Sequence, residues 1–341
     1  MSNSKPTLLK RKWVGLILST LLFGGLLAIF VDPTTLAQTI GRLNLSEIGV
    51  LASLYSATMV LRILRIRYAL GERPAPKPLQ LIYASVLHQF FNHIIPARLG
   101  ELSLPYFLHR RCDIPLTKAA TVLIAIRFFD LLILLLFGAI ALLLLLQSQL
   151  EVSINIGLSL FAIGALVAGS ILAWIGFVYF LDLKIKSPIC EYDRKKLAAY
   201  LHRIRGFAAR VQEEFRSNWP AAKQATTLCN SILIWLTLLA FFHYFLHFAG
   251  YEVKIRQTMI GSAIANLTQL LPINSLGSIG TLEAGWTAGF HLAGLPVEVG
   301  VATGLLMHSF VILYLFLITG LFWGMGQLAR VKRDSDRREK E

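Results

Sequence analysis

Long apolar runs, separated by short basic stretches, follow one another along most of the chain. A helix needs about 20 apolar residues to cross the roughly 30 Å hydrocarbon core of a bilayer. Runs of this kind lie at 13–31, 48–66, 116–146, 154–181, 225–248 and 297–328. The pattern predicts an all-α polytopic transmembrane helix bundle, a single transmembrane domain over 1–341 that is membrane-embedded over 10–328.

Two further apolar segments, 79–109 and 257–295, do not fit as simple spans. Each divides into two short halves around a centre that contains Pro and Gly, and neither half is long enough to cross a bilayer. Backbone that is broken at membrane depth is tolerated only where protein or a wet cavity surrounds it. We therefore expect two re-entrant hairpins, the first from the cytoplasmic side and the second from the opposite side.

The charge distribution orients these elements. Of 341 residues, 55% are hydrophobic and 15% are charged, against roughly 25% charged in soluble domains, which excludes a disordered chain and disfavours a soluble enzyme. Lys and Arg number 33 against 19 Asp and Glu, and all but Arg42, Lys254 and Arg256 lie in segments that the predicted spans place on one side. This bias predicts a cell (inner or plasma) membrane protein with both termini in the cytoplasm. The bilayer explains the basic balance, so nucleic acid is not an expected partner.

Three segments outside the central spans carry further signals. The basic start before 13–31 fits a secretory signal or an uncleaved anchor, and the length of the run favours the anchor. Between 191 and 217, apolar residues recur every three or four positions among Arg and Lys, which predicts an amphipathic helix on the anionic cytoplasmic leaflet, either a spacer or a lipid sensor. The tail 329–341 is expected to be a solvated charged anchor. The three cysteines are expected to be reduced and inert; they are Cys112, Cys190 and Cys229.

The two broken segments resemble each other. Both show an Asn, an apolar pair, a Pro, one or two Gly and then a Glu, and a Pro opens a long apolar span 13 or 14 residues later. The matching residues are Asn92, Pro96, Gly100 and Glu101 in the first and Asn266, Pro272, Gly277, Gly280 and Glu283 in the second. Transporters built from inverted repeats place their substrate where broken helices meet. An inverted repeat is therefore favoured over two independent Pro and Gly kinks.

Charged side chains within the apolar segments are the main candidates for chemistry. An ionised group at membrane depth costs roughly 2.5–3.5 kcal/mol on insertion scales, so it requires a partner or a wet cavity. Arg127 and Asp130 are three residues apart on one helical face, and so are Arg98 and Glu101. Each pair is either an architectural salt bridge or part of a site whose arginine meets a phosphate.

A lipid headgroup site would use several kinds of residue. Arginine suits a phosphodiester, glycine lets the backbone approach a ligand, and broken helix ends present amides to anions. Glutamates would receive an amino group or couple transport to protons, whereas Arg62 and Arg65 are alternatively interfacial residues whose charged ends reach water. The candidate substrate-binding residues are Arg62, Arg65, Asn92, Pro96, Arg98, Gly100, Glu101, Arg127, Asp130, Asn266, Pro272, Asn274, Gly277, Gly280 and Glu283.

Histidines and nucleophiles give weaker signals. His243 and His247 are four residues apart, which suits a metal on a helix, but an aromatic-rich membrane helix explains them better. A proton relay through His88, His93 or His308 is a less favoured alternative. The sequence shows no phosphate-binding loop and no dinucleotide fingerprint, and we predict no catalytic residues, no metal and no cofactor.

Three motifs resemble those of the lysylphosphatidylglycerol synthase transmembrane region, also called the flippase-like integral membrane family. They are Asn92-x-x-x-Pro96-x-Arg98-x-Gly100-Glu101, Arg127-Phe128-Phe129-Asp130 and Pro272…Gly277…Gly280…Glu283. The resemblance covers nearly the whole of 10–328 and implies an all-helical fold with re-entrant elements and a role in handling lipids. An aminoacyl-transferase domain follows in bifunctional members. Here a short charged tail follows the last span, so synthase activity is not expected, and His308 stands where the family often has Arg.

Together these features favour a lipid translocase rather than an enzyme. It would move a phospholipid or a polyprenyl- or glycolipid-class lipid, with an anionic, phosphate-bearing or aminoacylated headgroup, between leaflets through a site formed by the two hairpins. One alternative is an intramembrane enzyme on lipid-linked substrates with Glu101 or Glu283 as base. Another is a scaffold for a separate lipid-modifying partner enzyme, and an oligomer is compatible with each.

Overall fold

The computed structural model describes residues 41, 44–71, 76–95, 98–149, 195–269, 278 and 280–338, and within these ranges the chain is helical, without strands. The expected all-α class is therefore confirmed. The predicted spans 13–31 and 154–181 lie outside the described residues. So do the candidates Pro96, Pro272, Asn274 and Gly277 and the cysteine Cys190.

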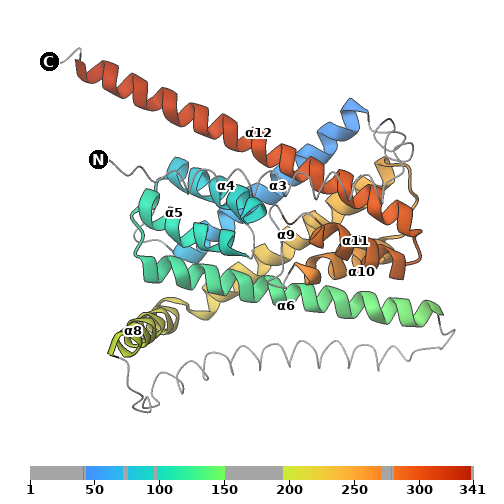
Figure 1. Ribbon diagram of the computed structural model, residues 1–341, viewed down its shortest axis with the longest axis horizontal. Coiled ribbons are helices and arrows are strands. Elements are labelled where there is room, and N and C mark those ends of the chain that lie inside the picture. Colours follow the sequence, from blue (N-terminus) through green and yellow to red (C-terminus); the bar gives the residue numbers. More distant parts are fainter. Residues whose placement is uncertain are drawn as a thin grey trace, which may run out of the picture. The chain divides into compact units, whose positions relative to one another are not determined.

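Four of the described helices are long and apolar enough to cross a bilayer, over Leu45–Leu70, Leu116–Ala141, Ala221–Phe248 and Val297–Phe322. They belong to α3 (Leu45–Leu70), α6 (Leu116–Gln149), α9 (Ala221–Phe248) and α12 (Val297–Arg338), and they match four predicted spans (Figure 1). Local sequence explains where three of them begin. Pro115, Pro220 and Pro296 directly precede α6, α9 and α12, and a proline has no N–H to leave unpaired at a helix start.

The two unusual apolar segments are broken helices, as predicted. The first consists of α4 (Pro78–Ile94), a short 3₁₀ turn η1 (Leu99–Leu102) and α5 (Ser103–Cys112). The second consists of α10 (Ile255–Thr268) and α11 (Thr281–Leu292). Their re-entry into a membrane and their relation by an inverted repeat stay predictions.

The amphipathic segment forms α8 (Lys195–Asn218), close to the predicted 191–217. It packs on α6, where the Thr121 hydroxyl donates to the carbonyl oxygen of Val211 at 3.3 Å. At its end the ring of Phe215 stacks on Trp219 with centroids 5.3 Å apart. The polar helix is thus anchored to a membrane-length helix by its apolar side.

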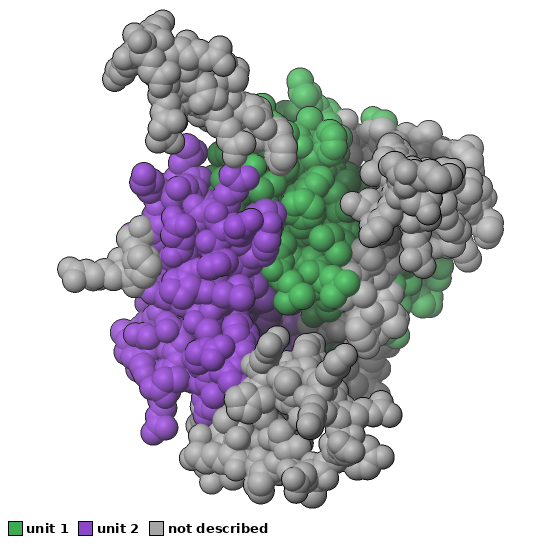
Figure 2. All heavy atoms as spheres, turned by 60° about the vertical axis from the view of Figure 1, so that its left-hand side comes forward, with its two compact units in different colours: residues 1–55, 82–103, 240–341 green, residues 56–81, 104–239 purple. Residues whose placement is uncertain are grey.

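The chain divides into two compact units that interleave along the sequence (Figure 2). Unit 1 comprises 1–55, 82–103 and 240–341, and unit 2 comprises 56–81 and 104–239. Most of the first broken segment and all of the second belong to unit 1. The expected single transmembrane domain stays a prediction.

Close glycine contacts join α10, α11 and α12 in the core of unit 1. The three helices are drawn in orange and red in Figure 1. A Cβ on Gly261 would lie 2.6 Å from the ring of Phe290, and one on Gly289 would lie 3.0 Å from the Cα of Gly261. A Cβ on Gly304 would lie 3.0 Å from Trp286, whose indole is fully buried. Small residues let helix backbones approach closely, which is how helices associate in lipid. The helices α10 and α11 are too short to span a bilayer, and their close packing against each other and against α12 holds them in place.

Candidate functional site

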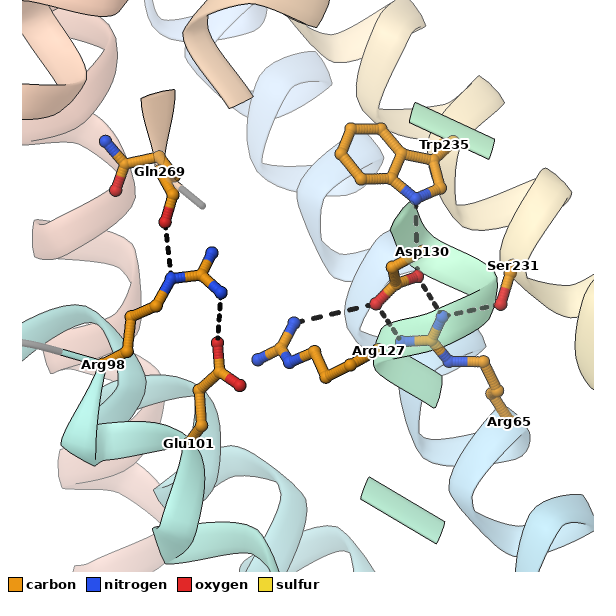
Figure 3. A network of polar contacts seen from close by, with 8 residues as sticks. All are labelled: Arg65, Arg98, Glu101, Arg127, Asp130, Ser231, Trp235 and Gln269. Carbon is orange, nitrogen blue, oxygen red and sulfur yellow. Dashed lines mark hydrogen bonds and ion pairs between the residues drawn. The ribbon is translucent and has the colours of Figure 1, made fainter. Parts of the chain in front are cut away.

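Arg98 joins the two broken segments within unit 1. It has a left-handed backbone, with φ 58° and ψ 9°, directly before η1. Its Nε donates to the carbonyl oxygen of Gln269 at 2.6 Å, at the end of α10, and its Nη1 lies 3.2 Å from Oε1 of Glu101 (Figure 3). Of the two alternatives that the spacing leaves open, the structure contains the ion pair of Arg98 with Glu101. The bond to Gln269 brings the break of the first segment to the break of the second.

A tight backbone contact positions the residues around Arg98. A Cβ on Gly100 would lie 2.7 Å from the Cα of Asn92, so only glycine fits where η1 passes the last turn of α4. His88 Nδ1 lies 2.9 Å from the Ser103 hydroxyl, which ties α4 to α5. The first segment therefore turns back on itself at the break, and Gly100 and Asn92 act through the backbone in the described contacts.

Glu283 lies at the start of α11 and has two partners. Its Oε2 accepts the backbone N–H of Gly280 at 2.6 Å, which caps the helix, while Gly280 has φ 88°. Its Oε1 lies 2.6 Å from Nδ1 of His308 on α12. Both side chains are buried, with Glu283 7% and His308 2% exposed. The carboxylate therefore links the second break to the long terminal helix.

Unit 2 contains a second charged cluster, which draws on α3, α6 and α9 (Figure 3). Arg65, 3% exposed, places Nη1 2.5 Å from Oδ1 of Asp130 and 2.7 Å from the Ser231 hydroxyl. Arg127 lies 3.7 Å from the other carboxylate oxygen, and Trp235 Nε1 donates to Asp130 at 3.4 Å. The Asp130 side chain is 14% exposed, and a carboxylate so far removed from water is tolerated when charged and hydrogen-bonding partners surround it.

Arg65 is the main partner of Asp130, although sequence spacing singled out Arg127. The predicted Arg127–Asp130 pair exists but is the longer contact. Arg62, one turn earlier on α3, is half-buried and lies close enough to Asp130 to act on it electrostatically. At least three arginines therefore act on this carboxylate, and the cluster holds a local excess of positive charge among the residues that build it.

The remaining candidates have local roles. Asn266 donates from Nδ2 to the carbonyl oxygen of Ser262 in its own helix at 2.7 Å. His243 Nδ1 lies 3.1 Å from the hydroxyl of Thr258 on α10. Across the described part of the chain, His, Cys, Asp and Glu form no group of three that would hold a metal ion.

Ser231, Trp235 and Gln269 belong to these clusters, although the sequence does not indicate them as site residues. Each meets a charged side chain that lies 105 to 171 residues away in sequence. Ser231 and Trp235 are four residues apart on α9, but serine and tryptophan are common in membrane helices, so no local signal marks them. The sequence offers His308 only as one alternative for a proton relay, and no spacing indicates that Glu283 is its partner.

The family model of the lysylphosphatidylglycerol synthase TM region matches residues 13–320. No curated protein and no solved structure matches the chain. The matched range contains both broken segments and the arginine cluster.

Proposed function

Because the chain belongs to the family of the lysylphosphatidylglycerol synthase TM region, a membrane family with a lipid-related function, we propose that it is a lipid translocase. It moves a lipid with an anionic, phosphate-bearing or aminoacylated headgroup between leaflets. The observation that carries the proposal is the bond from Arg98 to Gln269, which joins the two helix breaks in one compact unit. Transporters with broken helices bind their substrates at such a meeting point.

The geometry at Arg98 suits a phosphate that competes with Glu101. The side chain of Arg98 is 30% exposed, and its contact with Glu101 is a 3.2 Å ion pair rather than a short bond. A phosphodiester presents two oxygens to the planar guanidinium and replaces the carboxylate as acceptor. An amino group on the headgroup then pairs with the released Glu101. One pair of residues thereby serves both a phosphate and an aminoacylated headgroup.

Headgroup binding at Arg98 acts on the helix breaks. The guanidinium that meets the phosphate also holds the end of α10 through Gln269. When the phosphate draws Arg98 away from this bond, the first segment is released from the second. The two broken segments then move apart and expose the headgroup to the other leaflet. The left-handed backbone of Arg98 adds local strain of about 1 kcal/mol, which favours rearrangement at this residue.

The test is a leaflet-accessibility assay on the full chain in proteoliposomes. Lipids labelled on phosphodiester headgroups, with and without an added lysyl group, are compared with a labelled diacylglycerol that lacks phosphate. We expect the phosphate-bearing labels to exchange at least tenfold faster than in protein-free vesicles, and the neutral lipid to remain unaffected.

Variants of Arg98 distinguish the role of its guanidinium group from the role of its left-handed backbone. Arg98→Gly accepts the positive φ but lacks the guanidinium, and we expect exchange to fall at least tenfold. Arg98→Lys keeps the charge without the planar donor pair and is expected to fall in between. Arg110→Gln, an exposed arginine on α5, is the control and should behave as wild type.

Three results would overturn the proposal. Folded protein that accelerates none of the labelled lipids excludes an autonomous translocase. A chemically altered lipid after incubation supports an intramembrane enzyme instead. Wild-type exchange by Arg98→Gly removes the binding role of Arg98.

A further inference from the structure

We propose that Glu283 and His308 form a proton-binding dyad that couples lipid movement to proton movement in the same cycle. The inference rests on the proposed translocase function and adds a second ligand, the proton. It arises from a buried acid–imidazole contact on two helices, α11 and α12, which the lipid-binding residues do not use.

The dyad has one atom without a partner. His308 Nδ1 faces Glu283 Oε1 at 2.6 Å, whereas His308 Nε2 is buried and meets no hydrogen-bond partner in the described part of the chain. A buried imidazole nitrogen without a partner is costly in either protonation state. A structural histidine normally satisfies both ring nitrogens, so the geometry points to a nitrogen that exchanges a proton.

The proton balance follows from this arrangement. In the unloaded state the neutral ring carries its proton on Nδ1 and donates to the ionised Glu283, so the dyad has one negative charge. Proton uptake at Nε2 gives an imidazolium beside the carboxylate and a net charge of zero. The Nδ1–H bond to Oε1 is kept in both states. Loading therefore changes the charge of the dyad without breaking its contact.

Other ionisable groups lie on the elements of unit 1, and the described contacts join none of them to the dyad. His243 faces Thr258, His291 Nδ1 lies 3.2 Å from the carbonyl oxygen of Leu295, and Tyr314 packs edge-on against Tyr55. Apart from the dyad, the ionisable groups of unit 1 whose side chains the structure describes are Glu47, Tyr55, Tyr83, His88, His93, Arg98, Glu101, His243, Tyr244, His247, Tyr251, Glu252, Lys254, Arg256, His291, Glu298 and Tyr314. The described side-chain hydrogen bonds of Glu283 and His308 therefore join them only to each other and to the backbone of Gly280.

The dyad is mechanically connected to the helix break. Glu283 caps α11 through the N–H of Gly280, and two residues later Gly285 lies against the side chain of Thr268 at the end of α10. Gln269 follows and accepts the bond from Arg98. Protonation of His308 places a positive charge beside the Glu283 carboxylate, and this charge competes with the start of α11 for the carboxylate that caps it. Neutralising the dyad also removes a negative charge that opposes an anionic headgroup, so proton and lipid load together.

The experiment imposes a pH difference of two units across proteoliposomes and follows the final distribution of the labelled phosphate-bearing lipid. One proton for each lipid allows accumulation of up to about 100-fold, since each pH unit corresponds to a factor of ten. His308→Asn places an amide nitrogen near the former Nδ1 but removes the titrating ring. We expect it to exchange lipid without responding to the gradient. His291→Asn, at an exposed position on α11, is the matched control and should accumulate lipid as wild type does.

The outcomes separate the two proposals. If the wild-type protein exchanges lipid but the final distribution does not depend on the pH gradient, the dyad is overturned and the translocase proposal stands. A normal gradient response in His308→Asn has the same meaning. Absence of all exchange overturns the translocase. The dyad is then decided by ¹⁵N resonances of the histidine rings in the wild-type chain, where a His308 Nε2 that stays in one state from pH 5 to pH 9 overturns it. Protonation of His308 Nε2 that is seen in the wild-type chain and is lost in Glu283→Gln supports the dyad.

Discussion

Units 1 and 2 each hold a carboxylate that is largely shielded from solvent, and they stabilise it in different ways. Glu283 in unit 1 is held by one imidazole and one backbone amide. Asp130 in unit 2 is held by Arg65 and Arg127, with Arg62 nearby, and by the indole of Trp235. The first arrangement changes charge when a proton binds, whereas the arginines of the second remain charged at every physiological pH. On the proposed dyad, unit 1 therefore carries a charge that depends on proton binding, whereas the charges of the arginine cluster in unit 2 are permanent.

The units also differ in how their helices pack. Unit 1 contains the short helices α10 and α11, which depend on glycine contacts. Unit 2 contains α6, a continuous helix of 34 residues, and the amphipathic α8 packed against it. Short helices that end at a break can shift as separate pieces, whereas a continuous helix moves as a whole. A moving part is thus expected in unit 1, and a fixed frame in unit 2.

The largest expected effect comes from removing the carboxylate of the arginine cluster in unit 2. Asp130→Asn leaves Arg65 buried without its carboxylate, and loss of one partner of a buried pair typically costs about 3–5 kcal/mol. Thermal unfolding of the purified protein in detergent measures this loss. Asp113→Asn makes the same chemical change at an exposed left-handed residue and should be silent. A stable Asp130→Asn protein would show that Asp130 does not hold the frame.

A medium effect is expected from the glycine contacts of unit 1. Gly289→Ala places a Cβ 3.0 Å from the Cα of Gly261, and overpacking of this kind costs about 1–3 kcal/mol. Gly320→Ala on α12 has nothing within 4 Å of its Cβ and should be neutral or slightly stabilising, because alanine favours helix. The same unfolding assay compares both variants. Equal stability of the two would mean that α10 and α11 do not need their close approach.

The smallest effect concerns a single thiol of unit 2. Burial, followed by the negative charge of Asp113, raises the pKa of Cys112 to about 11 from the ordinary 9.0. At pH 8 the thiolate fraction is then about 100-fold lower, and alkylation is slowed at least as much. The alkylation rate should rise about tenfold per pH unit up to pH 11 in a variant with Cys190 and Cys229 replaced by Ser.

The same pKa has a consequence for stability at alkaline pH. The folded state holds the thiol proton of Cys112 more tightly than the unfolded state does. The resulting contribution to the free energy of unfolding is therefore complete below pH 9. It is lost as the pH rises towards 11. Rapid alkylation at pH 8, at the rate of an unfolded thiol, would contradict the burial of Cys112 in the frame.

Local sequence by itself determined the helices and the pairs within them. Apolar runs of membrane length gave α3, α6, α9 and α12, and Pro and Gly marked the two broken segments. The pairs Arg98–Glu101 and Arg127–Asp130 were predictable because residues three apart face the same side of a helix. These features depend on neighbours along the chain, which the sequence contains.

Only the tertiary structure decided which charges meet across helices. Arg65 and Asp130 are 65 residues apart, Arg98 and Gln269 are 171 apart, and Glu283 and His308 are 25 apart on different helices. Spacing cannot predict these contacts, because they depend on how each helix is rotated and packed within its unit. Arg65 therefore changes from an isolated arginine on an apolar run into the buried partner of Asp130, and His308 from an isolated histidine into half of a dyad.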